Sequence, residues 1–139
     1  MENLFTFQHN YTVMDEDYEN RITIFNDGSL SIYQMQTNKY EPEAKNIKKE
    51  PNKDLLVEIN SCLETYKNDY EDISIHECDN YITYKISIKE NENTINIFNK
   101  NDKDYVTLST IIKEIKKVIE KYYPNIINWS KADPENILV

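Results

Sequence analysis

The residues in this sequence best suited to chemistry are two cysteines and two histidines, and they lie far apart. Cys62 and Cys78 form no CxxC pair, and their spacing does not decide whether they form a disulfide. His76 and Cys78 fall in an alternating segment, so a strand there would place both on one face. Two ligands do not make a zinc site, which needs three or four, and the spacing of His9 and Cys62 supplies no others. We therefore expect no metal and no cofactor, and most simply two small buried thiols, with a disulfide between them left open.

The same histidine and cysteine could in principle form a catalytic pair, but the sequence lacks the backbone that such a pair requires. Gly28 is the only glycine in the chain. A glycine-rich elbow that exposes a nucleophile is therefore absent, and one glycine cannot build a P-loop or a GxGxxG turn. We expect a protein that is not an enzyme.

Carboxylates are the most abundant candidate ligands, with 25 acidic residues in the chain. The alternating acids of residues 15–19 resemble the start of a calcium loop. An EF-hand loop needs a glycine at its sixth position and a bidentate glutamate at its twelfth, and Asn20 and Asn26 occupy those positions. This segment is better interpreted as a solvated acidic loop.

Two clusters combine carboxylates with tyrosines, a combination that suits recognition of a basic protein surface through stacking and electrostatic steering. If both clusters lie on one side of the molecule, they form a single acidic surface; the alternative is that they only keep the protein soluble. The candidate partner-binding residues are Asp15, Glu16, Asp17, Tyr18, Glu19, Asp69, Tyr70, Glu71 and Asp72.

The charge balance narrows the class of partner. The formal net charge is −9, and Arg21 is the only arginine among 16 basic residues. Nucleic-acid recognition relies on arginine forks and a basic footprint, so direct binding to nucleic acid is not expected. The sequence favours a small protein-binding module of the inhibitor, immunity or anti-defence type. The alternatives are a self-associating accessory protein, and a domain that binds a small ligand or a metal.

The composition also bears on origin and compartment. No apolar run is long enough to span a membrane, and the first ten residues do not resemble a secretory signal, although a mature form with its signal removed would look the same. Lys, Ile, Asn and Tyr make up 63 of the 139 residues, as in proteins of low-GC bacteria or phages. We expect a cytoplasmic protein that does not bind membranes.

Two segments have the apolar spacing of amphipathic helices. Residues 107–123 repeat apolar side chains at three- and four-residue intervals, with Thr107 or Ser109 as the candidate cap and Pro124 as the stop. Residues 51–68 show the same spacing, and Asn52 is a candidate cap.

Other segments alternate apolar and polar residues, as strands do. The clearest are residues 21–25 and 30–35, which flank a turn containing Gly28 and so predict a β-hairpin. Residues 73–78, 81–89 and 94–99 predict a three-stranded meander, with residues 90–93 as one of its turns. Residues 4–14 predict one or two further strands.

Together these elements predict an α+β fold in the order β-β-α-β-β-β-α, with two amphipathic helices on one face of an antiparallel sheet. The 139 residues suit a single domain. Its core is expected over residues 21–123, with a mobile connection at 36–50 and a tail at 124–139.

Overall fold

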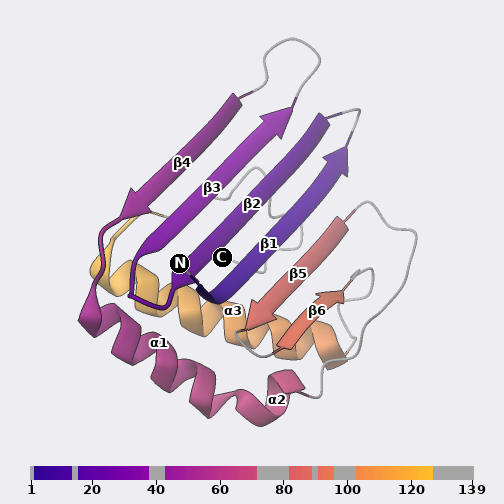
Figure 1. Ribbon diagram of the computed structural model, residues 1–139. Helices are drawn as coiled ribbons and strands as arrows, with labels where there is room; N and C mark the ends of the chain where they lie inside the picture. The colour runs from indigo at the N-terminus through magenta and orange to yellow at the C-terminus, as the bar shows by residue number, and fades with distance from the viewer. Residues whose placement is uncertain are drawn as a thin grey trace.

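The computed structural model describes residues 2–13, 16–37, 43–71, 82–88, 91–95 and 103–126. These residues form an antiparallel sheet with helices, which confirms the α+β class (Figure 1). Across the sheet the strand order is β4-β3-β2-β1-β5-β6. The elements are β1 (Asn3–Val13), β2 (Glu16–Phe25), β3 (Leu30–Thr37), β4 (Glu43–Lys49), α1 (Lys53–Thr65), α2 (Lys67–Glu71), β5 (Ile82–Ile88), β6 (Asn91–Ile95) and α3 (Lys103–Tyr122).

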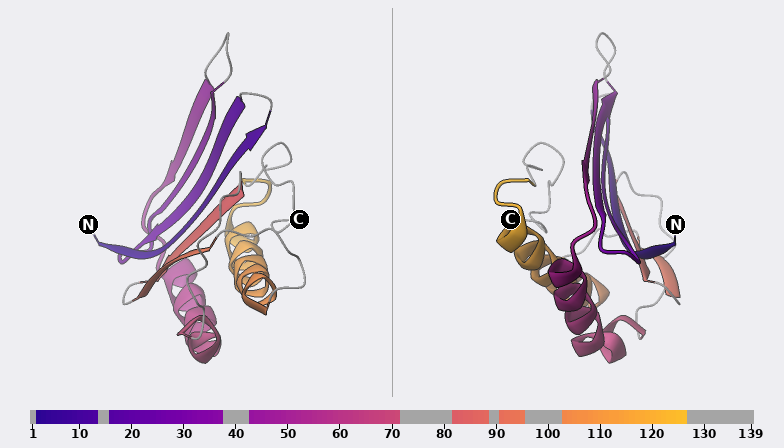
Figure 2. Two further views of the ribbon diagram at one scale, coloured as in Figure 1. Left: turned by 90° about the vertical axis from the view of Figure 1, so that its right-hand side faces the viewer. Right: turned by 60° about the vertical axis from the view of Figure 1, so that its left-hand side comes forward.

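The helices α1 and α3 lie together on one face of the sheet, and the views in Figures 1 and 2 agree on this arrangement. The core is formed where the inward-facing residues of the strands pack against the apolar faces of these helices. The two-residue period of the strands and the 3.6-residue period of the helices therefore both direct apolar side chains into the same layer. The sheet contributes Leu4, Phe5, Phe7, Ile22, Ile24, Leu30 and Ile32, and the helices contribute Leu55, Ile59, Leu63, Ile111, Ile112, Ile115 and Ile119.

The predicted hairpin is present as β2 and β3. Gly28 has a φ of +85°, and its N–H donates to the carbonyl of Phe25 at 3.0 Å. The carboxylate of Asp27 accepts from the hydroxyl and the backbone N–H of Ser29 at 2.5 and 2.9 Å. These bonds to Ser29 hold the pKa of Asp27 below its usual range. The turn joins two strands whose register then places Arg21 opposite Tyr33.

The order of the described elements differs from the expected one. Four strands precede the first helix, and β1 lies inside the sheet between β2 and β5. Phe5 and Phe7 of β1 are fully buried, so the core includes residues that precede residue 21. The alternation of this segment is real, but polar residues surround it and local pattern alone does not show that it is central.

Residues 36–50 were expected to form a mobile connection, but Glu43–Lys49 within this segment form the strand β4. This strand pairs with β3, and Ile47 lies opposite Ile32. Its remaining side chains are mostly charged or polar. The segment therefore lacks the alternation of apolar and polar residues by which a strand is recognised in a sequence. An edge strand tolerates that composition because one of its sides and one of its faces meet water.

The helix α3 begins at Lys103, four residues before the expected start. Thr107 and Ser109 therefore lie inside the helix and do not cap it, and the hydroxyl of Ser109 donates back to the carbonyl of Val106 at 3.1 Å. The helix ends at Tyr122, with Pro124 and the positive φ of Asn125 beyond it. None of the described helices is long and apolar enough to span a membrane.

The expected meander is described only in part. Residues 82–88 form β5 as predicted, whereas β6 occupies Asn91–Ile95 and so includes most of the expected turn. In the register of these two strands, Ile88 lies opposite Asn91. The strand expected at residues 73–78, the end of the one expected at 94–99, and most of the tail lie outside the described residues.

Asn52 caps α1 as predicted, since its side-chain oxygen accepts from the backbone N–H of Leu55 at 3.1 Å. Replacing Asn52 with alanine should lower the free energy of unfolding by about 1 kcal/mol, the typical loss for an N-cap. Urea denaturation measures this loss. Asn60→Ala, at an exposed position of the same helix, is the matched control, and equal destabilisation by both changes would contradict the capping role.

Candidate functional site

The structure separates the two acidic clusters. Asp17, Tyr18 and Glu19 lie in β2 near its connection to β1, whereas Asp69, Tyr70 and Glu71 lie in α2. These two segments are at opposite ends of the molecule (Figures 1 and 2). Glu16 begins β2, and Asp15 and Asp72 lie outside the described residues. The single acidic surface that would join both clusters is therefore not formed by the described residues.

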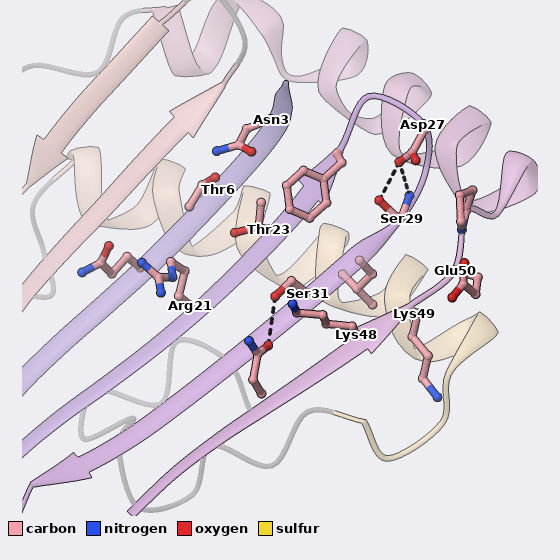
Figure 3. Close-up of a pocket in the computed structure, with 15 residues that line it drawn as sticks. Asn3, Thr6, Arg21, Thr23, Asp27, Ser29, Ser31, Lys48, Lys49 and Glu50 are labelled. Carbon is pink, nitrogen blue, oxygen red and sulfur yellow. Dashed lines mark hydrogen bonds between the residues drawn. The ribbon is translucent and has the colours of Figure 1, made fainter. Parts of the chain in front are cut away.

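The face of the sheet opposite α1 and α3 carries a hollowed surface within the described residues. We call it the open face, and define it by the side chains that alternate outward from β1 to β4: Thr6, Gln8, Asp17, Glu19, Arg21, Thr23, Ser31, Tyr33, Asn46 and Lys48. Part of it is a hollow of about 850 Å³. Figure 3 shows the hollow with both helices behind the sheet, so no described helix covers it.

Hydroxyl, amide, cationic and carboxylate groups line this hollow, together with the apolar residues Phe25, Leu30 and Pro51. The hydroxyl of Ser31 donates to the amide oxygen of Asn46 at 3.1 Å, and Lys48 lies beside Ser31 in Figure 3. Thr23 is buried although it is on the open face. At the end of the hollow nearest α1, the bonds between Asp27 and Ser29 fix the turn. The surface therefore offers many hydrogen-bonding groups on a rigid strand framework.

Arg21 lies at the centre of the open face, and two neighbours hold it in place. Its guanidinium is 5.0 Å from the centre of the Tyr33 ring and 3.8 Å from the carboxylate of Glu19. The side chain is still 42% exposed, so it remains accessible to a partner. An arginine stacked on a tyrosine is preorganised, which reduces the entropy lost when it binds.

Sequence reasoning placed Arg21 in a strand but gave it no role in a site. A usable signal existed: the turn at Gly28 fixes the hairpin register, and that register makes Arg21 and Tyr33 cross-strand neighbours. The hollow gave no comparable signal, because it depends on how four strands twist relative to one another.

The open face has an acidic end. By strand alternation Asp17 and Glu19 share it with Arg21, and they lie toward the β1–β2 connection. Lys48 lies toward the opposite end, beside the β2–β3 turn. One continuous face thus carries acidic groups at one end, the Arg21–Tyr33 pair in the middle and a cation at the other end.

The metal alternative gains no support from the described residues. Among them no group of three or more histidine, cysteine, aspartate or glutamate side chains could hold a metal ion. His9 is fully buried on β1, and Cys62 is half-buried on α1, where burial and then the nearby Glu114 raise the pKa of its thiol. His76 and Cys78 lie outside the described residues.

A second polar cluster joins the two large helices. The hydroxyl of Tyr122 donates to Glu58 across the interface, and Lys121 bonds to the other oxygen of Glu58 at 2.8 Å. The bond to Glu58 raises the pKa of Tyr122 to about 12, and Lys121 followed by Tyr122 lowers the pKa of Glu58. All three groups partner one another, so we interpret the cluster as a link between α1 and α3.

The fold and the open face together define an α+β protein with one sheet surface that no described helix covers. No protein-family model and no curated protein matches the chain. The interpretation of the site therefore depends on its geometry.

Proposed function

We propose that this protein is a small, non-enzymatic binding module that uses the open face to bind a protein partner. The observation that carries the proposal is the partly exposed Arg21–Tyr33 pair, set among hydroxyl and amide groups on the sheet. Arginine and tyrosine dominate the energetics of protein interfaces, and short polar side chains supply adaptable hydrogen bonds.

The charge distribution supports a partner with a basic patch. The chain carries a net charge of −9, which attracts cationic proteins over long range. Asp17 and Glu19 would meet the basic patch at the acidic end of the open face. Of the two clusters singled out in the sequence, this proposal keeps the one in β2 and leaves out the one in α2, which lies at the other end of the molecule.

The hollow suits a protein surface better than a small molecule. Small-molecule pockets enclose most of their ligand and are lined mainly by apolar groups, whereas this hollow is open and its lining combines polar and apolar groups. An inhibitor, immunity or anti-defence protein is one class that needs only such a binding surface. We keep the expectations of a cytoplasmic location and of no direct binding to nucleic acid as parts of the proposal.

A charge-reversal comparison tests the proposal. A tagged protein captures its partner from a host lysate, and the association rate of the purified pair is then measured at several salt concentrations. Reversal of two acids on the open face, Asp17→Lys with Glu19→Lys, should slow association about tenfold at low salt, because rim charges act mainly on the association rate. The slowing should fade as salt increases.

The matched control reverses two exposed acids at the other end of the molecule, Glu64→Lys with Asp69→Lys. Both double variants change the net charge equally, so a general charge effect would slow both equally. That result, or a lysate that yields no stoichiometric partner, would contradict binding through the open face. Thermal unfolding of both variants confirms that they are folded.

A further inference from the structure

The strand β4 forms an edge of the sheet. It pairs with β3 from Leu30↔Lys49 to Gln36↔Glu43, and no described strand pairs with its other side. Figure 1 shows β4 at the margin of the sheet along its whole length. In such a strand, alternate backbone N–H and C=O groups point away from the sheet and can pair with another chain.

The edge strand carries three lysines and one glutamate, Glu43, in a protein whose formal net charge is −9. Lys45, Lys48 and Lys49 are all exposed. Lys45 and Lys48 form no ion pair with any residue in the described ranges, and the ammonium of Lys49 lies 5.5 Å from the ring centre of Tyr123. Strand alternation places Lys45 and Lys49 toward one face and Lys48 toward the other. A strand added here would meet positive charge on both of its faces.

We propose that β4 is a docking edge for an acidic, extended segment of a partner protein, which joins the sheet as an additional strand. Backbone hydrogen bonds would give affinity, and the lysines would select carboxylate side chains on the incoming strand. The same lysines oppose pairing with a second copy of the chain, because two adjacent β4 strands would bring like charges together. This interaction uses the free backbone edge of β4; it shares Lys48 with the open face but does not depend on the partner proposed for that face.

A pair of peptides tests the proposal with the full-length protein. The probe is an acetylated and amidated peptide of alternating valine and glutamate, seven residues long, and its counterpart carries lysine in place of glutamate. Binding is followed by NMR through amide chemical shifts and the hydrogen exchange of β4. The acidic peptide should bind and slow exchange at alternate amides of β4, whereas the lysine peptide should do neither.

Two double variants then separate strand addition from general charge attraction. Lys45→Glu with Lys48→Glu should weaken binding of the acidic peptide at least fivefold. Lys67→Glu with Lys113→Glu, which changes the net charge equally at exposed helical positions, should change it less than twofold.

Four results would overturn the proposal. The acidic peptide does not bind, or it binds both double variants equally, or it binds without slowing exchange in β4. The fourth is that exchange in β4 slows as the protein concentration is raised without peptide, because the occupant of the edge is then a second copy of the chain.

Discussion

Replacing Gly28 with alanine is expected to lower the free energy of unfolding by about 2–5 kcal/mol, because a left-handed backbone and a steric clash both oppose any side chain there. The residue has a φ of +85°, and a Cβ at this position would lie 2.4 Å from the backbone oxygen of Asn52. The backbone N–H of Asn52 also donates to the carbonyl of Gly28 at 3.1 Å. The clash therefore falls on the residue that caps α1, and urea denaturation measures its effect.

A second substitution separates the two causes. Asparagine tolerates a positive φ better than alanine does, but it adds the same Cβ. If the contact with Asn52 dominates, Gly28→Asn should be about as destabilising as Gly28→Ala, and Gly28→Val should be worse than either. A Gly28→Asn protein as stable as the wild type would show that backbone conformation alone requires the glycine.

Acidification should destabilise the protein through His9. This side chain is fully buried, and burial lowers its pKa from 6.5 to about 4. Between these values the unfolded chain binds a proton at His9 that the folded protein does not. The contribution of His9 to the free energy of unfolding is therefore fully present above pH 6.5 and is lost as the pH decreases toward 4. The contribution of His9 to this loss is about 3 kcal/mol.

The difference between wild type and His9→Gln isolates this contribution, because the carboxylates titrate in both proteins. Denaturant unfolding at several pH values between 7.5 and 4 should show wild type losing about 3 kcal/mol more than the variant. Parallel stability profiles for the two proteins would contradict a neutral, buried His9. The baseline cost of the substitution appears at pH 7.5 and does not affect the comparison.

The elements that could be predicted from the sequence are those with strong local signals. The hairpin around Gly28 was correct because a single glycine between two alternating segments fixes both the turn and the register. The cap at Asn52 was correct because capping involves only the first turn of a helix. By contrast, β4 was missed because its stability comes from pairing with β3, which is not visible in its own sequence. Its lysines are compatible with a strand at the edge of a sheet, but an edge position cannot be recognised from the local pattern.

The candidate site was harder to predict for the same reason. The sequence left open whether two acidic clusters separated by about 50 residues lie together, and only the three-dimensional path of the chain shows that β2 and α2 occupy opposite ends. The Arg21–Tyr33 pair was within reach, because the hairpin register determines it. The alternation of residues 4–14 predicted strands, but their central place depends on a distant partner, β5.

The central place of β1 has a consequence for how the protein is made. Ile24 pairs with Leu30 across a short turn, whereas Phe5 pairs with Ile88. Contacts between distant residues form slowly, because closing a long loop costs more entropy than closing a short one. During synthesis the strands β1 to β4 can assemble first, and the unpaired side of β1 stays open until β5 has been translated. For that interval the sheet of described strands β1 to β4 has an open edge at each side, and of these two edges the one on β4 carries the lysines that oppose mispairing.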